Sequence, residues 1–114
     1  MPLQDFAIRP DQCFIAGKWV ASASGQTLPL LNPSDGTKLA DIVRGNVADI
    51  DAAVQAATAA RESDWGHATA ADRGRVLAKI GRAVLDHVEA LAVLEAKDVG
   101  KPLSQARADA VALA

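Results

Sequence analysis

The chain has 114 residues and a formal net charge of −2, with 12 basic and 14 acidic side chains. This length is enough for one small domain, and the mild negative charge argues against a nucleic-acid surface, which needs clustered basic residues. No apolar run reaches the length of a membrane span, and the first residues lack the pattern of a secretory signal. We therefore expect a soluble cytoplasmic protein with no nucleic-acid or membrane partner.

Half of the residues are hydrophobic, but the chain has only two Phe, two Trp and no Tyr. Its apolar residues are mostly Ala and Val, and each buries little area at about 25 cal/mol per Å². Helices whose apolar residues are mostly Ala and Val therefore need other layers of the protein packed against them to be stable. The single cysteine, Cys13, excludes an internal disulfide and a multi-cysteine metal site, and it suits a reducing compartment.

The first third of the chain predicts turns and short strands. Residues 1–12 contain two prolines and predict an N-terminal arm. Residues 14–20 predict a tight hairpin, because β-favouring residues flank Ala16-Gly17. A small polar loop follows at residues 22–26.

Two further strands are predicted at residues 27–31 and 38–44. Pro29 has no N–H to donate to a ladder, so the first of these strands is expected at an edge. The cluster Asn32-Pro33-Ser34-Asp35-Gly36 predicts the turn between them. Residues 13–44 are therefore expected to form a region of short antiparallel strands.

The hydrophobic period then changes from 2 to 3.6 residues, which predicts helices in the rest of the chain. Asn46 is the expected N-cap of the first helix, with Asp49 in the position of a capping box. This helix is expected to end near residues 62–64, with a break at residues 65–68. Its predicted apolar face consists of Val47, Ile50, Val54 and Ala57.

One long second helix is predicted from Thr69, as N-cap, to about Asp98. Asp72 lies in its first turn, where the helix dipole favours an anion, and Gly100 is expected to end it in the left-handed region. The predicted apolar stripe consists of Leu77, Ile80, Val84, Val88 and Leu91.

A third helix is predicted with Pro102 as its first residue. Its apolar positions continue to the end of the sequence without a glycine, an asparagine or another breaker: Leu103, Ala106, Ala110 and Leu113. This pattern leads us to expect a piece of a longer protein, in which residues 45–114 are the helical part of an incomplete domain.

Six short motifs follow one another in a fixed order: Phe14-Ile15-Ala16-Gly17-Lys18-Trp19-Val20, Asn32-Pro33-Ser34-Asp35-Gly36, Asp49-Ile50-Asp51-Ala52-Ala53-Val54, Trp65, Asp72-Arg73 and Glu95-Ala96-Lys97-Asp98-Val99-Gly100-Lys101-Pro102. This ordered set resembles the beginning of the NAD(P)-dependent aldehyde dehydrogenase superfamily. The resemblance covers nearly all of the chain from Phe14 onward. Each motif alone is weak, whereas the ordered set is specific.

The resemblance implies an α/β fold in which short strands and three helices form part of a Rossmann-like cofactor domain. Full-length members of the superfamily oxidise aldehydes to carboxylic acids with NAD or NADP, using a cysteine nucleophile and a glutamate base. All of these residues belong to later segments, so the resemblance places no catalytic, cofactor-binding or metal residue in this chain. It implies a fragment that is inactive and cofactor-free alone, with the remainder of the chain as its partner and a homo-oligomer as the full-length state.

The one thiol and the two imidazoles are weak candidates for chemistry. A nucleophilic cysteine needs a helix N-terminus or a nearby cation to lower its pKa, whereas Cys13 immediately precedes a predicted strand and is expected to pack. His67 and His87 are 20 residues apart without a cysteine or clustered carboxylates, so we expect surface or hydrogen-bonded side chains.

The glycines do not match a phosphate-binding loop, and we expect turn glycines at Gly17, Gly25, Gly36 and Gly45. Lys101 lacks the neighbours of a P-loop lysine and is expected to tether two helices.

Trp19 and Trp65 are expected to anchor packing. Four carboxylates are expected at helix starts or on solvent faces: Asp49, Asp51, Asp72 and Asp109. Acid–base chemistry would need two of them facing each other. Some members of the superfamily bind a monovalent cation near the corresponding turn, and Asp109 is the position in this chain that could match.

A second interpretation belongs to another class: a standalone helical interaction module, derived from the same family, that binds a partner through its Ala-rich face. The sequence leaves open the aldehyde substrate, the choice between NAD and NADP, and the oligomeric state.

Overall fold

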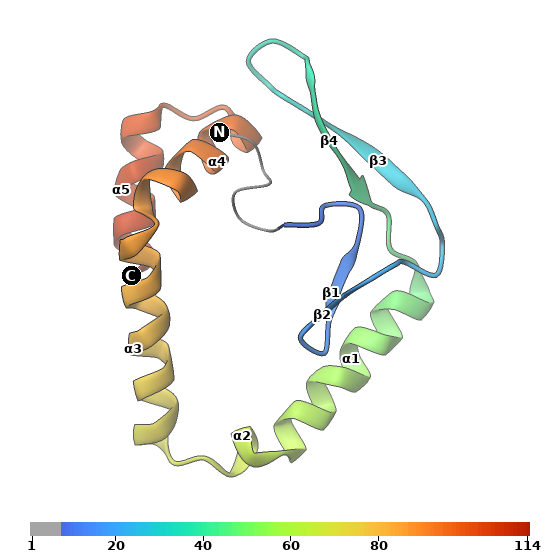
Figure 1. Cartoon of the computed structure of the whole chain (residues 1–114), viewed down its shortest axis with the longest axis vertical. Helices are drawn as coiled ribbons and strands as arrows, with labels where there is room; N and C mark the ends of the chain where they lie inside the picture. Colours follow the sequence, from blue (N-terminus) through green and yellow to red (C-terminus); the bar gives the residue numbers. More distant parts are fainter. Residues whose placement is uncertain (1–7) are drawn as a thin grey trace. The chain divides into compact units, whose positions relative to one another are not determined.

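The computed structural model describes residues 8–114 as short strands followed by helices (Figure 1), which confirms the expected α/β class. The described residues divide into two compact units. One contains residues 8–30 and 38–68, and the other contains residues 31–37 and 69–114. The division into an arm at 1–12, a strand region at 13–44 and a helical part at 45–114 stays a prediction.

In the first unit, β1 (Cys13–Ile15) and β2 (Lys18–Val20) form the predicted hairpin, with Phe14 opposite Trp19. The two turn residues both have positive φ, 52° at Ala16 and 75° at Gly17. Two-residue hairpin turns of this kind match the right-handed twist of the strands. The hairpin prediction is therefore confirmed, although Ala16 holds a left-handed conformation that a residue with a Cβ rarely adopts.

The strands β3 (Thr27–Leu31) and β4 (Lys38–Val43) pair in a second two-stranded sheet. In the connecting turn, which belongs to the second unit, the Asn32 N–H donates to the Thr37 carbonyl at 2.8 Å. Gly36 has a φ of 74°, as the turn pattern predicts.

Residues 1–7 of the predicted N-terminal arm lie outside the described residues. The last part of the arm is tied to the first unit, because the Val43 N–H donates to the Pro10 carbonyl at 2.7 Å.

The first helix, α1 (Val47–Glu62), begins and ends where the sequence predicts, and Asn46 and Asp49 form the expected capping box. The predicted break contains a short helix, α2 (Asp64–His67), which the sequence pattern does not predict. The close approach of α2 to the end of α1 depends on glycine at position 66. A Cβ at Gly66 would lie 1.6 Å from the carbonyl oxygen of Arg61, so only glycine fits there.

The long second helix is a wrong prediction, because the structure has two helices, α3 (Ala70–Asp86) and α4 (Val88–Val99). At His87 the backbone has φ −121° and ψ 16°, and its N–H donates to the Val84 carbonyl instead of continuing the helical ladder. The His87 ring Nδ1 lies 2.8 Å from the Ala83 carbonyl oxygen. The side chain thus takes the backbone acceptor that helix continuation would use.

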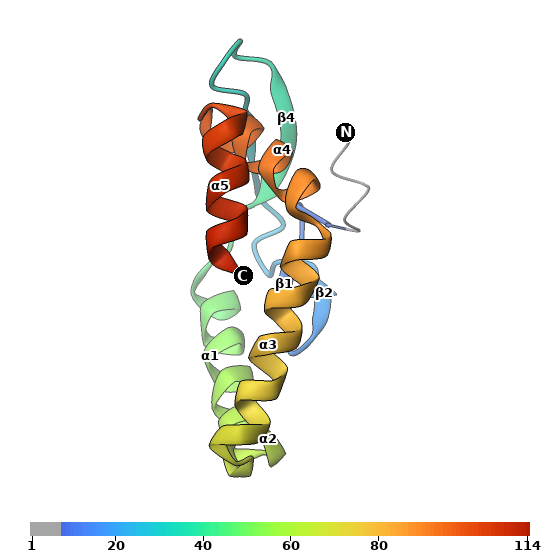
Figure 2. The same ribbon diagram turned by 90° about the vertical axis from the view of Figure 1, so that its left-hand side faces the viewer.

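The last helix, α5 (Leu103–Leu113), doubles back beside α4 (Figure 2). Gly100 ends α4 with a φ of 74°, as predicted, whereas Pro102 is the N-cap of α5 and not its first helical residue. The side chains that α4 and α5 bury are small: Ala92 and Ala106 are 0% exposed and Ala110 is 5% exposed. Alanines allow the two helices to approach closely.

Candidate functional site

Lys101 lies at the corner between α4 and α5, in the segment Gly100-Lys101-Pro102. Its Nζ donates to Glu95 Oε1 and to Asp109 Oδ2, both at 2.6 Å. These bonds to Asp109 and Glu95 raise the pKa of the lysine. The expected tether between two helices is therefore confirmed, and the ammonium is already matched by two carboxylates.

A second ion pair between the same helices was not predicted. The Arg107 guanidinium donates to both carboxylate oxygens of Glu89, from Nε at 2.5 Å and from Nη2 at 2.8 Å. The hydrogen bond from Arg107 lowers the pKa of Glu89. The two residues are 18 positions apart, so only the antiparallel arrangement of α4 and α5 brings them together.

An open hollow of about 290 Å³ lies in the second unit, between the β3–β4 turn and the α4–α5 corner. The Asn32 Oδ1 at its rim accepts the Ser34 N–H at 3.0 Å, so this amide is used within the turn. Gly100 lies against the turn, and a Cβ there would be 2.9 Å from Pro33 Cγ. The hollow is lined by Asn32, Ser34, Val93, Ala96, Lys97, Gly100, Lys101 and Leu103.

Asp49 is the buried charged residue of the first unit. Its carboxylate accepts the Ser22 hydroxyl at 2.6 Å, the Ala23 N–H at 2.9 Å and the Asn46 N–H at 2.8 Å. These hydrogen bonds lower the pKa of Asp49, and the bond from the Ser22 hydroxyl has the largest effect. The sequence predicts the capping role but not the tie to the loop after β2, because the two segments are 27 positions apart.

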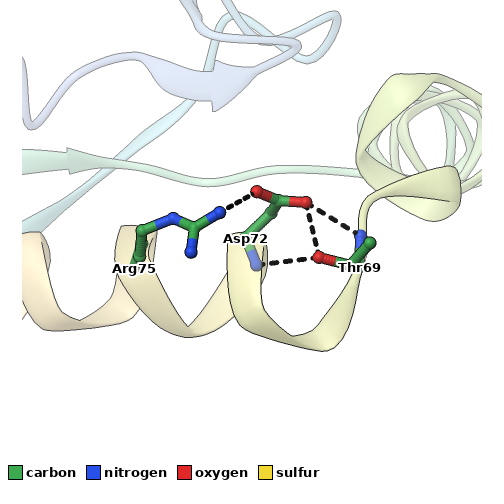
Figure 3. Close-up of polar contacts among 3 residues, drawn as sticks. All are labelled: Thr69, Asp72 and Arg75. Atoms are coloured by element: carbon green, nitrogen blue, oxygen red, sulfur yellow. Dashed lines mark hydrogen bonds and ion pairs between the residues drawn. The ribbon is translucent and has the colours of Figure 1, made fainter.

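Asp72 shows the same use of a carboxylate at the start of α3 (Figure 3). The Thr69 hydroxyl donates to Asp72 Oδ2 at 2.5 Å, the Asp72 N–H donates to Thr69 Oγ1 at 3.1 Å, and Arg75 pairs with the other carboxylate oxygen. The bonds from Thr69 and Arg75 lower the pKa of Asp72. The predicted N-cap is confirmed, and the carboxylate serves the helix end.

The other two carboxylates of the predicted set differ in their surroundings. Asp51 is exposed on α1. Asp109 is also exposed, and its Oδ2 is the atom that binds Lys101. The monovalent-cation role of Asp109 stays a prediction. Within residues 8–114, no three His, Cys, Asp or Glu side chains are grouped closely enough to hold a metal ion.

The structure places the thiol and the imidazoles on separate local elements. Cys13 is half-buried and is the first residue of β1, rather than preceding the strand. His67 and His87 are exposed, and each ring Nδ1 contacts the carbonyl oxygen four residues earlier, at 2.9 Å from Ser63 and at 2.8 Å from Ala83. The expectation of surface, hydrogen-bonded histidines is confirmed.

Both tryptophans are partly exposed, and the packing role is seen for Trp19, whereas that of Trp65 stays a prediction. The Trp19 ring meets Phe14 edge-on across the hairpin, with ring centroids 5.1 Å apart, as aromatic pairs prefer. Trp65 is partly exposed in α2.

The predicted turn glycines have the expected conformation at three positions, with positive φ at Gly17, Gly25 and Gly36. Each of these three glycines leads into a strand, β2, β3 or β4, so none belongs to a glycine-rich loop at the start of a helix. Gly45 lies just before α1, close to Asp49. None of the helices described in residues 8–114 is long and apolar enough to cross a membrane.

A family model described as "Aldehyde dehydrogenase family" matches residues 19–114. An aldehyde dehydrogenase of Enchytraeus buchholzi is 41% identical over 105 residues, which are 90% of this chain and 21% of that protein. The solved structure of a G224D mutant of an aldehyde dehydrogenase from Bacillus cereus superposes with a TM-score of 0.87 at 35% identity, over 98% of this chain and 23% of that chain.

A betaine aldehyde dehydrogenase from Staphylococcus aureus, solved in complex with NAD⁺, superposes with a TM-score of 0.83 at 33% identity. The superposition covers 89% of this chain and 21% of the Staphylococcus aureus chain. The chain thus spans about a fifth of the length of the relatives that it matches.

Proposed function

Since this chain belongs to the aldehyde dehydrogenase family, we propose that it is one segment of a longer enzyme that oxidises an aldehyde to a carboxylic acid with NAD or NADP. The observation that carries the proposal is the unequal coverage of the match. Almost the whole chain matches the Enchytraeus enzyme, but the match covers only 21% of that enzyme. The activity therefore belongs to the parent protein, and the chain is one structural part of it.

The role that we propose for this segment is to support the cofactor domain of the parent. Its charged side chains are engaged in local structure: Asp49 holds a loop, Asp72 caps α3, and Lys101 joins α4 to α5. A catalytic acid or base needs access to a substrate proton, and these groups are committed to partners within the chain. We propose that the segment alone is inactive and that the nucleophile and the base lie elsewhere in the parent.

The residues of this segment do not fit a dinucleotide site. A phosphate-binding loop needs glycines at the start of a helix, whereas the glycines with positive φ before α1 each lead into a strand. We propose that other parts of the parent bind the cofactor. The NAD⁺ complex of the Staphylococcus relative supports NAD for the parent.

We further propose that the parent works in the cytoplasm as a homo-oligomer. The lone cysteine, which suits a reducing compartment, supports the cytoplasm. The family resemblance supports the oligomer.

The test compares two proteins, the purified 114-residue chain and the product of the native gene. Each is incubated with NAD or NADP and a panel of aliphatic and aromatic aldehydes, and reduced cofactor is followed by absorbance. We expect oxidation by the native product and none by the chain. Oxidation by the chain alone would refute the segment's proposed inactivity. A native product that ends at Ala114 would instead favour the standalone interaction module.

A further inference from the structure

The turn between β3 and β4 contains the one place where the sequence sets a glycine directly after an aspartate or an asparagine, Asp35-Gly36. Both residues are exposed, and a Cβ built on Gly36 would meet no atom within 4 Å. Gly36 therefore has no side chain of its own, and no neighbour crowds it on that side. Its backbone nitrogen can close a five-membered ring with the side-chain carboxyl carbon of Asp35.

Ring closure of this kind isomerises an aspartate without an enzyme. The glycine nitrogen attacks the side-chain carboxyl carbon, a C–N bond forms, and the nitrogen loses its proton while one carboxyl oxygen leaves as water. A second water then opens the resulting succinimide at either carbonyl. One opening restores aspartate, and the other leaves isoaspartate, in which the main chain runs through the former side chain. The two products have the same composition, and no oxidant or cofactor is needed.

Three hydrogen bonds restrain the two reacting groups in this turn. Asp35 Oδ1 accepts the Thr37 N–H at 2.9 Å and the Thr37 hydroxyl at 2.7 Å. The Gly36 N–H donates to the Asn32 carbonyl at 2.8 Å. The reaction requires the carboxyl group to turn toward the attacking nitrogen, and two donors on one oxygen restrict that rotation.

The Thr37 hydroxyl also acts on the electronic state of the carboxyl group. Its hydrogen bond, followed by that of the Thr37 N–H, lowers the pKa of Asp35 because both bonds favour the ionised form. A carboxylate is a poorer electrophile than the neutral acid. Among the three restraining bonds, the one from the hydroxyl is contributed by a side-chain donor, so a substitution can remove it and leave the backbone bonds in place.

We propose that Asp35-Gly36 is a site of spontaneous isoaspartate formation and that the Thr37 hydroxyl restrains the reaction. Conversion adds one atom to the main chain inside a turn that the Asn32 N–H closes on the Thr37 carbonyl at 2.8 Å. It therefore disturbs the geometry of that turn. The proposal goes beyond the proposed function and holds whatever reaction the parent catalyses.

The experiment follows isoaspartate in the product of the native gene during prolonged incubation at neutral pH. Three forms are compared: the wild type, Thr37→Val, which removes the hydroxyl, and Thr37→Ser, which keeps it and is the matched control. Digested peptides are separated by chromatography, and electron-transfer fragmentation distinguishes isoaspartate from aspartate. Asp51, exposed on α1, is the internal control. Synthetic peptides of residues 30–40, in wild-type and Thr37→Val form, give the rates without the folded turn.

We expect isoaspartate at position 35 and none at position 51. In the folded protein, Thr37→Val should isomerise about threefold faster than the wild type or more, roughly the factor that corresponds to one hydrogen bond of ordinary net strength. Thr37→Ser should stay near the wild type, and the two peptides should react at similar rates.

Two results would overturn the proposed site: isoaspartate that is absent from position 35 in Thr37→Val, or that forms as fast at position 51. Equal rates for the folded wild type and Thr37→Val would overturn the restraint. An acceleration of the same size in the peptides would also overturn it, since the effect would then belong to the local sequence and not to the folded turn.

Discussion

Gly100 combines two constraints that a single substitution can separate. Its φ is 74°, in the left-handed region, and a Cβ there would lie 2.9 Å from Cγ of Pro33 in the β3–β4 turn. Gly36 has the same φ of 74° but no atom within 4 Å of its Cβ position. Gly36→Ala therefore tests the backbone conformation alone, whereas Gly100→Ala tests the conformation together with the contact.

The expected magnitudes follow from these geometries. Placing an L-residue in the left-handed region costs roughly 1–2 kcal/mol, so Gly36→Ala should lower the free energy of unfolding by about that amount. Forcing a methyl group into a packed contact costs typically about 1–3 kcal/mol more. Gly100→Ala should therefore be more destabilising than Gly36→Ala by at least about 1 kcal/mol.

The assay is urea unfolding followed by far-UV circular dichroism, with both variants also made in a Pro33→Ala background. Removing the proline ring should recover most of the excess effect of Gly100→Ala, because residues in contact have non-additive effects. If Gly100→Ala and Gly36→Ala were equally destabilising, or if Pro33→Ala left their difference intact, the steric reasoning would be refuted.

Three further predictions follow from the described contacts. Gly66→Ala should destabilise the protein by about 3 kcal/mol or more, because the new methyl group would overlap the Arg61 carbonyl, and a small change in urea unfolding would contradict this. Gly74→Ala, in the interior of α3 with no atom within 4 Å, should instead stabilise by about 0.5–1 kcal/mol in the same measurement, and a loss of stability would count against the α3 geometry. Hydrogen bonds from Ser22, Ala23 and Asn46 lower the pKa of Asp49 below its ordinary value of 3.8, so their contribution is present above that value and is lost as pH falls through the folded-state pKa. Asp49→Asn should therefore be less stable than the wild type at neutral pH, with a difference in thermal unfolding that shrinks in acid; a difference independent of pH would contradict this.

Local signals in the sequence were sufficient for most of the fold. The caps at Asn46 and Thr69, the hairpin at Ala16-Gly17 and the end of α4 at Gly100 each depend on residues within a few positions of one another. Such features are set by short-range hydrogen bonds and by allowed φ values, which the residue types themselves determine.

Sequence patterns do not predict the structure where a local competition or a distant contact decides it. The apolar spacing runs through His87 without interruption, so periodicity predicts one helix, whereas the His87 ring competes for the Ala83 carbonyl and ends α3. The pair of Glu89 with Arg107 joins residues far apart in the chain. No spacing rule indicates it, because it exists only once α5 lies against α4.

The candidate site was predictable mainly in what its residues do not do. The lysine tether and the hydrogen-bonded histidines followed from the absence of the neighbours that catalytic or phosphate-binding motifs require. The buried tie between Asp49 and Ser22 was missed, because a capping carboxylate gives no sign in sequence of a second set of donors from another loop.

The alanine contact between α4 and α5 has a consequence for how this segment becomes ordered. Ala92, Ala106 and Ala110 have no side-chain rotamers to lose on burial, so the two helices can dock with little entropic penalty from their contact residues. The same methyl groups release little ordered water, and the driving force for docking is correspondingly small. The close fit of the alanines therefore sets how α4 and α5 pack, while their burial contributes little free energy to the docking. A neighbouring layer of the protein can fix the position of the two helices without rearranging bulky side chains.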